Sequence, residues 1–174
     1  METKQWVRSA IGLCLIASLA ISCQKQEEVD ETAESQTVDP RAELVAFVEM
    51  AATELEARGE AAFADFRQAG SKWFQGDRYL FVIDLEGNTL CHAANPDLEG
   101  TSLLDMQDED GISPTREMLA VLESNEAGWI SYKWPRPGAT EASAKASYVM
   151  KAKLGDRVVA IGSGMYTEPE IAEK

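Results

Sequence analysis

The spacing of apolar residues along the chain changes from a helical period to a strand period. Between Asp39 and Gly59 the apolar side chains recur every three or four residues, which predicts a helix with one buried face. Asp39 offers an N-cap acceptor and Pro40 fits the first helical position, so the helix should begin there and end at Gly59. A second, short helix is expected over residues 60–68.

Strand patterns follow the two helices. An apolar run from Tyr79 to Ile83 predicts the first strand, in which Tyr79, Phe81 and Ile83 alternate in position with Arg78, Leu80, Val82 and Asp84. Glu86-Gly87-Asn88 supplies the backbone freedom that a tight turn needs before a second strand ending at His92. A loop over residues 95–110 leads to a helix that begins at Ser113-Pro114. Three further strands are predicted over residues 129–134, 145–151 and 157–166.

This order of elements predicts an α+β domain built on a five-stranded antiparallel sheet of the PAS type. No strand-to-helix turn carries a Gly-rich phosphate loop, so a parallel nucleotide-binding fold is not expected. About 130 residues make up the folded part, which is enough for one domain with a sizeable core and too few for two.

Residues 1–22 have the features of a bacterial signal peptide with a lipobox. Lys4 and Arg8 flank the start, and the apolar stretch that follows is shorter than the roughly 20 residues of a membrane-spanning helix. Cleavage would make Cys23 the N-terminus, and a lipid on Cys23 would anchor the chain to a membrane. Ala20 departs from the Leu that is common at that position of a lipobox. An ordinary signal peptide or a short membrane helix is the alternative.

The lipidated Cys and an acidic tether occupy residues 23–39. Their polar composition cannot bury enough apolar surface to become ordered. The tether would carry the domain, residues 40–168, away from the membrane on the periplasmic side, and residues 169–174 would form a C-terminal tail. Gln24 after the lipidated Cys favours the outer membrane over the inner one.

Charge and cysteine content narrow the range of partners. The chain carries 30 Asp and Glu against 16 Lys and Arg, a formal net charge of −14. No basic stripe is present to displace counterions from phosphates, which argues against nucleic acid as a partner. Cys14 would leave with the signal peptide and Cys23 would carry lipid, so Cys91 has no partner for an intramolecular disulfide.

Several runs of sequence resemble the single-Cache family of extracytoplasmic sensor domains. In chain order they are WFQGDRYLFVIDLEGNTLCHAANPDLEGTSLLD, GWISYKWPRPG, KASYVMK and VVAIGSGMY. The resemblance implies a PAS-like sheet with the long N-terminal helix on one face and the inserted loop-helix segment on the other. It also implies a small-molecule site between the sheet and that inserted segment.

Eight side chains at matching positions are candidates for this site: Trp73, Tyr79, Phe81, His92, Tyr132, Trp134, Lys145 and Tyr148. Aromatic walls exclude water and a cation fixes a carboxylate, so the expected ligand is a small organic acid, amino acid or amine. Lys145 or Arg67 would supply the cation. The alternative is core packing for each aromatic residue and a solvated helix end for Arg67. Ala93 follows His92 where the family usually has Pro.

Other chemistry is disfavoured by geometry and by ligand count. Adjacent strand residues point to opposite faces, so Cys91 should be separated from His92, and Leu90 should share the face of His92. A catalytic Cys–His pair, and with it an enzyme, is therefore not expected. One His gives no zinc ligand set. Residues 106–117 follow part of the EF-hand spacing but begin with Met106, so they should form a turn, and no cofactor is expected.

Together these features predict a lipid-anchored Cache domain that binds a small molecule and acts through an unidentified envelope or transmembrane transducer protein. The alternative is a structural or interaction lipoprotein that keeps the fold without a ligand. A sensor should have a pocket with convergent polar groups, whereas an interaction module should have a filled core and an exposed apolar patch.

Overall fold

The computed structural model describes residues 39–167. The expected signal peptide, Cys23, the tether up to residue 38 and the tail over residues 169–174 lie outside this range. The elements are α1 (Pro40–Arg58), η1 (Gly59–Ala61), α2 (Ala62–Phe66), β1 (Leu80–Asp84), β2 (Thr89–His92), η2 (Pro96–Leu98), α3 (Pro114–Ser124), β3 (Ala127–Pro135), β4 (Ala142–Leu154) and β5 (Arg157–Tyr166). No helix in this stretch is both long and apolar enough to cross a membrane.

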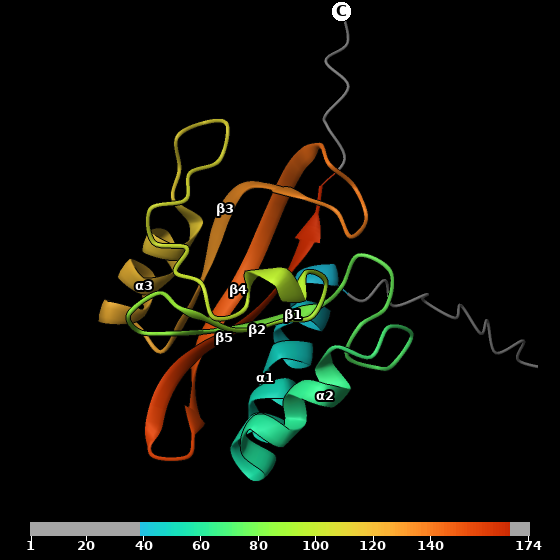
Figure 1. The fold of residues 1–174 in the computed structure, drawn as a ribbon, viewed down its shortest axis with the longest axis vertical. Helices are drawn as coiled ribbons and strands as arrows, with labels where there is room; N and C mark the ends of the chain where they lie inside the picture. The colour runs from blue at the N-terminus through green and yellow to red at the C-terminus, as the bar shows by residue number, and fades with distance from the viewer. Residues whose placement is uncertain (1–38, 168–174) are drawn as a thin grey trace, which may run out of the picture. The chain divides into compact units, whose positions relative to one another are not determined.

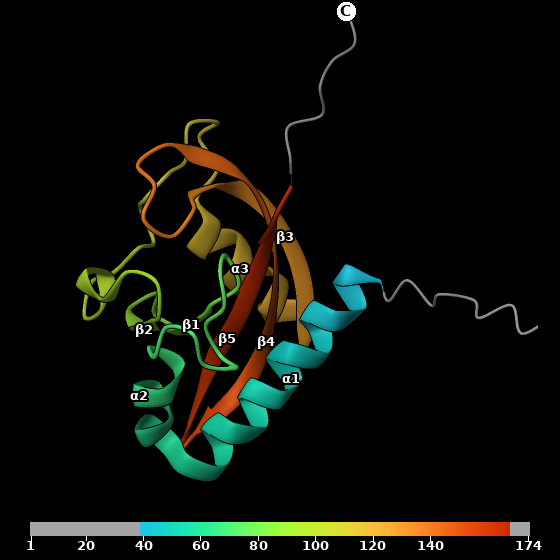
Figure 2. The same ribbon diagram turned by 90° about the vertical axis from the view of Figure 1, so that its right-hand side faces the viewer.

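The five strands form one antiparallel sheet in the order β2-β1-β5-β4-β3 (Figure 1). Helix α1 lies along one face of this sheet and α3 lies on the other (Figure 2). The predicted α+β class, the antiparallel sheet and the placement of the long N-terminal helix are confirmed.

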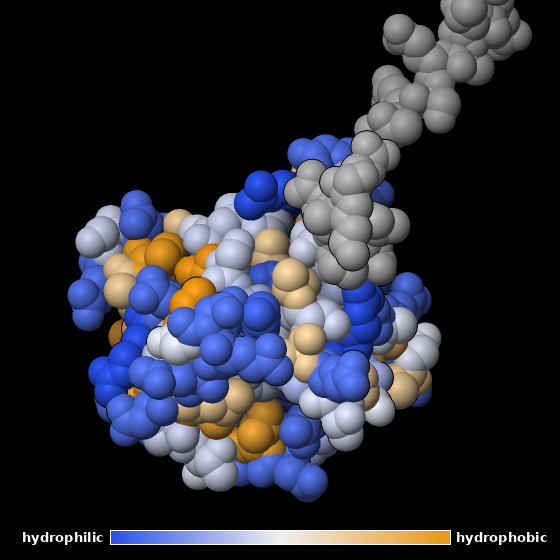
Figure 3. Space-filling view, turned by 90° about the horizontal axis from the view of Figure 1, so that it is seen from above, coloured by the Kyte–Doolittle hydropathy of each residue, from blue (hydrophilic) through white to orange (hydrophobic). Residues whose placement is uncertain are grey.

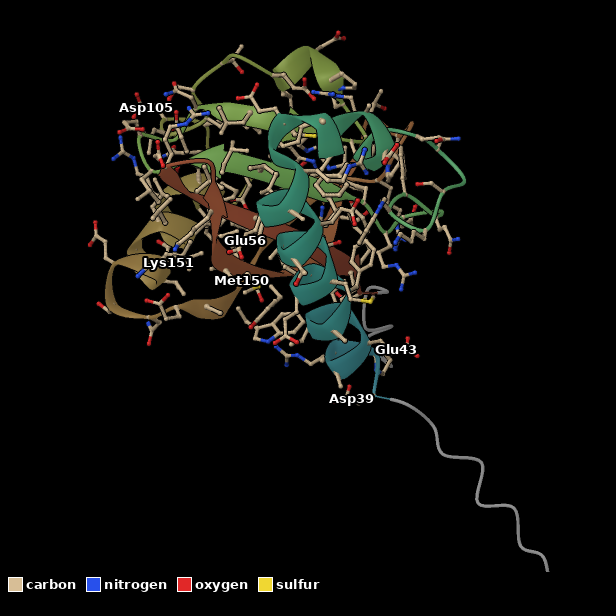
Figure 4. All side chains as sticks on the ribbon, turned by 90° about the horizontal axis from the view of Figure 1, so that it is seen from below. Asp39, Glu43, Glu56, Asp105, Met150 and Lys151 are labelled. Atoms are coloured by element: carbon tan, nitrogen blue, oxygen red, sulfur yellow. The ribbon has the colours of Figure 1, made fainter. Side chains whose placement is uncertain are left out.

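The ends of α1 follow from the residues expected to set them. The Asp39 carboxylate accepts a hydrogen bond from the Arg41 backbone N–H at 2.9 Å, and Pro40 occupies the first turn. Asp39 and the acidic Glu43 lie at this end of the helix (Figure 4), where negative charge complements the helix dipole. Gly59 ends the helix at φ 60°, a conformation that glycine adopts without strain.

The core has two clusters, one on each face of the sheet. The α1-side cluster joins the buried face of α1 to alternate residues of the strands, such as Leu80 and Val82 of β1. The α3-side cluster takes the other parity, with Phe81 and Ile83 of β1 packed near α3. Parity also separates the aromatic residues of β3 as predicted, since Trp129 packs against the α1-side cluster and Tyr132 belongs to the α3-side cluster.

One face assignment from parity is wrong. Leu90 was expected on the face of His92, but it packs with Cys91 against the α1-side cluster. The pairing of β1 with β2 shifts between Val82 and Ile83, so that Cys91 lies opposite Val82 and Thr89 lies opposite Ile83. The extra residue in β2 interrupts the alternation, as a β-bulge does, and turns Thr89 to the face of His92.

Replacement of Leu55 by Ala should destabilise the domain by about 2–5 kcal/mol, because this fully buried side chain of α1 packs in the α1-side cluster and its loss leaves a cavity. Met50 on the same helix is 58% exposed, so Met50→Ala should change stability by no more than about 0.5 kcal/mol. Urea unfolding followed by circular dichroism measures both values. Equal effects of the two substitutions would contradict the placement of α1.

Candidate ligand-binding site

A pocket of about 430 Å³ opens beside the sheet on the face away from α1. Tyr79, His92 and Trp134 line its base, at the ends of three strands. Its walls are the segment after β2, residues 94–98, and the last residue of β3 with the loop that follows it, residues 135–139. The centroid of the His92 ring lies 5.1 Å from that of the Tyr79 ring and 5.9 Å from that of the Trp134 ring, so the three rings form a continuous aromatic surface.

A chain of hydrogen bonds runs beneath this base. The Lys145 ammonium donates to the Tyr79 hydroxyl at 2.7 Å, and the hydroxyls of Tyr79 and Tyr166 lie 3.3 Å apart. Tyr166 in turn donates to the backbone carbonyl of Pro135 at 2.6 Å. Because the Tyr166 hydroxyl donates its only proton to Pro135, the Tyr79 hydroxyl must be the donor in its hydrogen bond to Tyr166. A ligand acceptor could therefore take the place of Tyr166 as the partner of the Tyr79 proton.

Lys145 is a buried cation without an acidic partner in the described part of the chain. It is 2% exposed, its Nζ lies 4.1 Å from the Tyr79 ring centroid, and no carboxylate of residues 39–167 lies within ion-pair distance of it. Burial lowers the pKa of Lys145 to about 7, and the more distant charge of Asp77 opposes that effect. An anion bound nearby would therefore stabilise the protonated form.

Space for Lys145 depends on the glycine beside it. Lys145 lies opposite Tyr166 in the pairing of β4 with β5, and Gly164 is two residues earlier on β5. A Cβ atom at Gly164 would lie 2.4 Å from the Lys145 Cε atom, closer than real contacts allow. The GSGMY run of the sequence thus makes room for the buried lysine and carries Tyr166.

His92 presents a neutral donor to the pocket. Its Nδ1 accepts a hydrogen bond from the backbone N–H of Asn95 at 3.0 Å, so the proton of the neutral ring is on Nε2. Within the described part of the chain, Nε2 has no hydrogen-bond partner and is not fully enclosed. Burial, followed by the charge of Lys145, lowers the pKa of His92 to about 4, so the ring is neutral at physiological pH.

Arg67 does not line the pocket, in contrast to its expected role as a candidate cation for the ligand. Its guanidinium donates to both carboxylate oxygens of Glu99, at 2.8 and 2.6 Å. Glu99 also accepts the backbone N–H of His92 at 3.0 Å. Arg67 thereby fixes the loop after β2 and the end of β2 to helix α2. Arg67 therefore affects the pocket indirectly: it positions Glu99, and Glu99 holds the backbone of His92.

Two other expected site residues lie on the α1 side of the sheet, opposite the pocket. Trp73 packs in the α1-side cluster against Phe66 and Phe47, with ring centroids 5.3 and 5.8 Å apart. Tyr148 packs there too, 5.5 Å from Trp129. Tyr148 is an odd number of positions from Lys145 on β4, so the two side chains must point to opposite faces.

Phe81 and Tyr132 lie on the expected face but deeper than the pocket. Both line a smaller cavity of about 30 Å³ that shares His92 and Trp134 with the pocket. The Tyr132 hydroxyl is hydrogen-bonded to Ser147 at 3.0 Å. Of the expected residues, the structure thus brings together Tyr79, His92, Trp134 and Lys145, with Phe81 and Tyr132 behind them.

The sequence analysis did not include Tyr166 or the two wall loops among the site residues. Tyr166 ends the run VVAIGSGMY, and alignment of β4 with β5 would have placed it opposite Lys145. Pro135 and Arg136 belong to the run GWISYKWPRPG, so the resemblance contained a signal for this wall. The wall formed by residues 94–98 has no periodic pattern that could assign it to the pocket.

The residues considered for other chemistry have structural partners. Cys91 lies in the α1-side cluster, separated from His92 as predicted, and burial raises the pKa of its thiol to about 12. The carboxylate of Asp108 accepts backbone hydrogen bonds from Asp110, Ile112 and Lys133 at 2.8–2.9 Å. Within residues 39–167 no three His, Cys, Asp or Glu side chains are grouped to hold a metal ion.

Comparison with known proteins identifies the family. The family model of the Cache domain matches residues 60–173, more than half of the sequence, and the chain belongs to this family. Methyl-accepting chemotaxis protein McpP of Pseudomonas putida is 37% identical over 100 residues, which cover 58% of this chain and 18% of McpP. Sensor histidine kinase MctS of Rhizobium johnstonii is 31% identical over 97 residues, covering 56% of this chain and 20% of MctS.

A solved structure supports the same assignment. It is described as the structural basis for carboxylic acid recognition by a Cache chemosensory domain, and it superposes with a TM-score of 0.63 at 28% identity. The match covers 74% of this chain and 93% of that domain. The chain matches only about a fifth of the length of the two curated relatives, so the similarity to them concerns one domain.

Removal of the Glu99 carboxylate should release the end of β2. In Glu99→Ala the backbone N–H of His92 loses its acceptor, and its hydrogen exchange should accelerate by about ten- to a hundredfold, as expected for loss of a bond to a charged group. Asp97→Ala, at an exposed position of the same loop, is the control and should leave the exchange unchanged. NMR-detected amide exchange measures both. An unchanged rate in Glu99→Ala would show that Glu99 does not hold β2.

Proposed function

We propose that this protein is an extracytoplasmic, sensor-type Cache lipoprotein whose ligand is a small carboxylic acid and which acts through a separate transducer protein. The observation that carries the proposal is the buried Lys145 ammonium, which has no acidic partner among the described residues and lies directly beneath the pocket base. A buried charge is costly unless it is paired, and a ligand carboxylate would supply the missing anion.

The lining of the pocket favours an acid over an amine or amino acid. Among residues 39–167, none of the side chains that line it is acidic, so a ligand ammonium would have no counter-ion from this part of the chain. The carboxylate would accept hydrogen bonds from the Tyr79 hydroxyl and from Nε2–H of His92. Lys145 would strengthen the Tyr79 donor from below through its own hydrogen bond to the same hydroxyl.

The relatives support both the ligand class and the mode of action. The similar Cache chemosensory domain was solved for its recognition of a carboxylic acid. McpP is a chemotaxis protein and MctS a histidine kinase, and each is about five times longer than the region that matches this chain. In this proposal the Cache domain performs the sensing step, and an unidentified envelope or transmembrane protein performs the output.

The proposal places the domain on the periplasmic side of a membrane, with a slight preference for the outer membrane. Its support is the lipobox before Cys23, the acidic stretch over residues 24–39 and Gln24 at the position after Cys23. The acidic stretch would allow the domain to reach a partner at some distance from the lipid.

The alternative, an interaction lipoprotein without a ligand, has less support. The large apolar side chains that are exposed in residues 39–167 are Met50, Leu85, Met106 and Val158, and they come from four different elements or loops. In the view of Figure 3 the apolar residues form separate patches between hydrophilic ones. A docking surface of the usual kind is larger and continuous.

Binding of propanoate should weaken as the pH rises above about 7. The carboxylate needs protonated Lys145, whose pKa in the free protein is about 7, whereas His92 with a pKa of about 4 stays neutral. Affinity should thus be about twofold lower at pH 7 than at pH 6, because half of Lys145 is deprotonated at its pKa, and it should then fall by up to about tenfold per pH unit. Calorimetric titrations between pH 6 and 9 measure this change.

Lys145→Met should bind propanoate at least about tenfold more weakly at pH 6 and without the pH dependence. Lys151→Met, on the same strand but paired with Glu126 at the surface, is the matched control and should behave like the wild type. A dissociation constant that stays flat between pH 6 and 9 in the wild type would refute the role of Lys145. Failure of every two- to four-carbon acid to bind would refute the carboxylate proposal itself.

Replacement of Cys23 by Ser should release the protein from membranes, because the acyl chains would have no attachment point. Detergent phase partitioning of the wild type and Cys23→Ser in the native host measures this. Cys91→Ser, with Cys91 buried in the α1-side cluster, is the control for loss of a thiol elsewhere. Equal partitioning of wild type and Cys23→Ser would overturn the lipid anchor.

A further inference from the structure

The hydroxyl of Thr89 is the buried side-chain polar atom that lacks a hydrogen-bond partner within residues 39–167. Thr89 is 1% exposed. Buried hydroxyls are hydrogen-bonded in most proteins, and one left without a partner destabilises the folded state. Such a group at the edge of a binding pocket therefore indicates a missing partner.

The backbone keeps Thr89 in this place. Its N–H donates to the carbonyl of Thr101 at 2.9 Å, and its own carbonyl accepts from the N–H of Gly100 at 2.8 Å. The bulge in β2 turns its side chain to the face of His92 and away from the α1-side cluster. Thr89 cannot withdraw from this face without losing both backbone bonds and the pairing opposite Ile83.

Thr89 lines the 30 Å³ cavity that adjoins the pocket. Most of the cavity wall is apolar, with Phe81, Ile83 and Met118 among its members. His92 and Trp134 line both this cavity and the pocket, so a ligand held at the pocket base lies next to it. A water molecule needs about 10–15 Å³ by this measure, so the cavity holds a group of one or two heavy atoms.

We propose that Thr89 is a specificity-determining residue of the site, and that its hydroxyl binds a hydroxyl or oxo oxygen carried by a short carboxylic acid. The inference rests on the proposed binding of a carboxylic acid and adds which acids are preferred. A threonine hydroxyl donates to an oxo group and accepts from a hydroxyl, so it suits both substituents. A plain alkyl acid would leave it without a partner, which is the physical basis of discrimination.

The test compares propanoate with 2-hydroxypropanoate, 3-hydroxypropanoate and 2-oxopropanoate by calorimetry on the wild type, Thr89→Val and Thr89→Ser. Valine keeps the shape and removes the hydroxyl, while serine keeps the hydroxyl. We expect the wild type to prefer at least one oxygenated acid over propanoate. Thr89→Val should reduce that preference by about five- to tenfold and leave propanoate binding unchanged, and Thr89→Ser should retain the preference.

Thermal unfolding without added acid provides the second readout. Thr89→Val should melt at the same temperature as the wild type or higher, because the substitution removes a buried hydroxyl without a partner. A lower melting temperature would mean that the hydroxyl has a partner in the free protein, such as an ordered water, and would overturn the inference. An unaltered preference in Thr89→Val would overturn it too. If none of these acids binds the wild type, the proposal that the ligand is a carboxylic acid is refuted, and the inference about Thr89 is refuted with it.

Discussion

The hydrogen bond between the Lys145 ammonium and the Tyr79 hydroxyl is the interaction on which the pocket depends. It connects β4 with the residue that precedes β1, across the intervening strand β5. An amine at this depth is tolerated only with partners, and Tyr79 with the adjacent aromatic rings supplies them. Gly164 on β5 leaves room for the lysine side chain, and any larger residue there would collide with it. The buried cation thus also determines which residue the central strand can carry at this position.

Most of the fold was predictable because its signals are local. The cap at Asp39, the stop at Gly59 and the change from helical to strand period depend on neighbouring residues, and the structure agrees with each. Alternation along β3 also separated Trp129 from Tyr132 correctly. The same rule, applied to β4, would have placed Tyr148 away from Lys145, whereas the matching positions of the family had suggested that both belong to the site.

The remaining features of the site arise from contacts between distant parts of the chain. The bulge that reverses Leu90 is a property of the pairing between two strands, which one strand's pattern does not contain. Arg67 finds its acidic partner 32 residues away, and Trp73 lies in a loop where alternation says nothing about direction. That the Thr89 hydroxyl has no hydrogen-bond partner among residues 39–167 is visible only after every neighbour is in place.

The Asp108 turn also affects how the domain meets other proteins. Strand β3 is the last strand on its side of the sheet, and such a strand exposes backbone groups that another chain can pair with. One carboxylate oxygen of Asp108 accepts a hydrogen bond from the backbone N–H of Lys133 in the middle of this strand. The other oxygen accepts hydrogen bonds from Asp110 and Ile112 within the Asp108 turn. A negatively charged loop thus blocks one backbone donor in the middle of the open edge, and its charge hinders sheet-to-sheet aggregation with another chain.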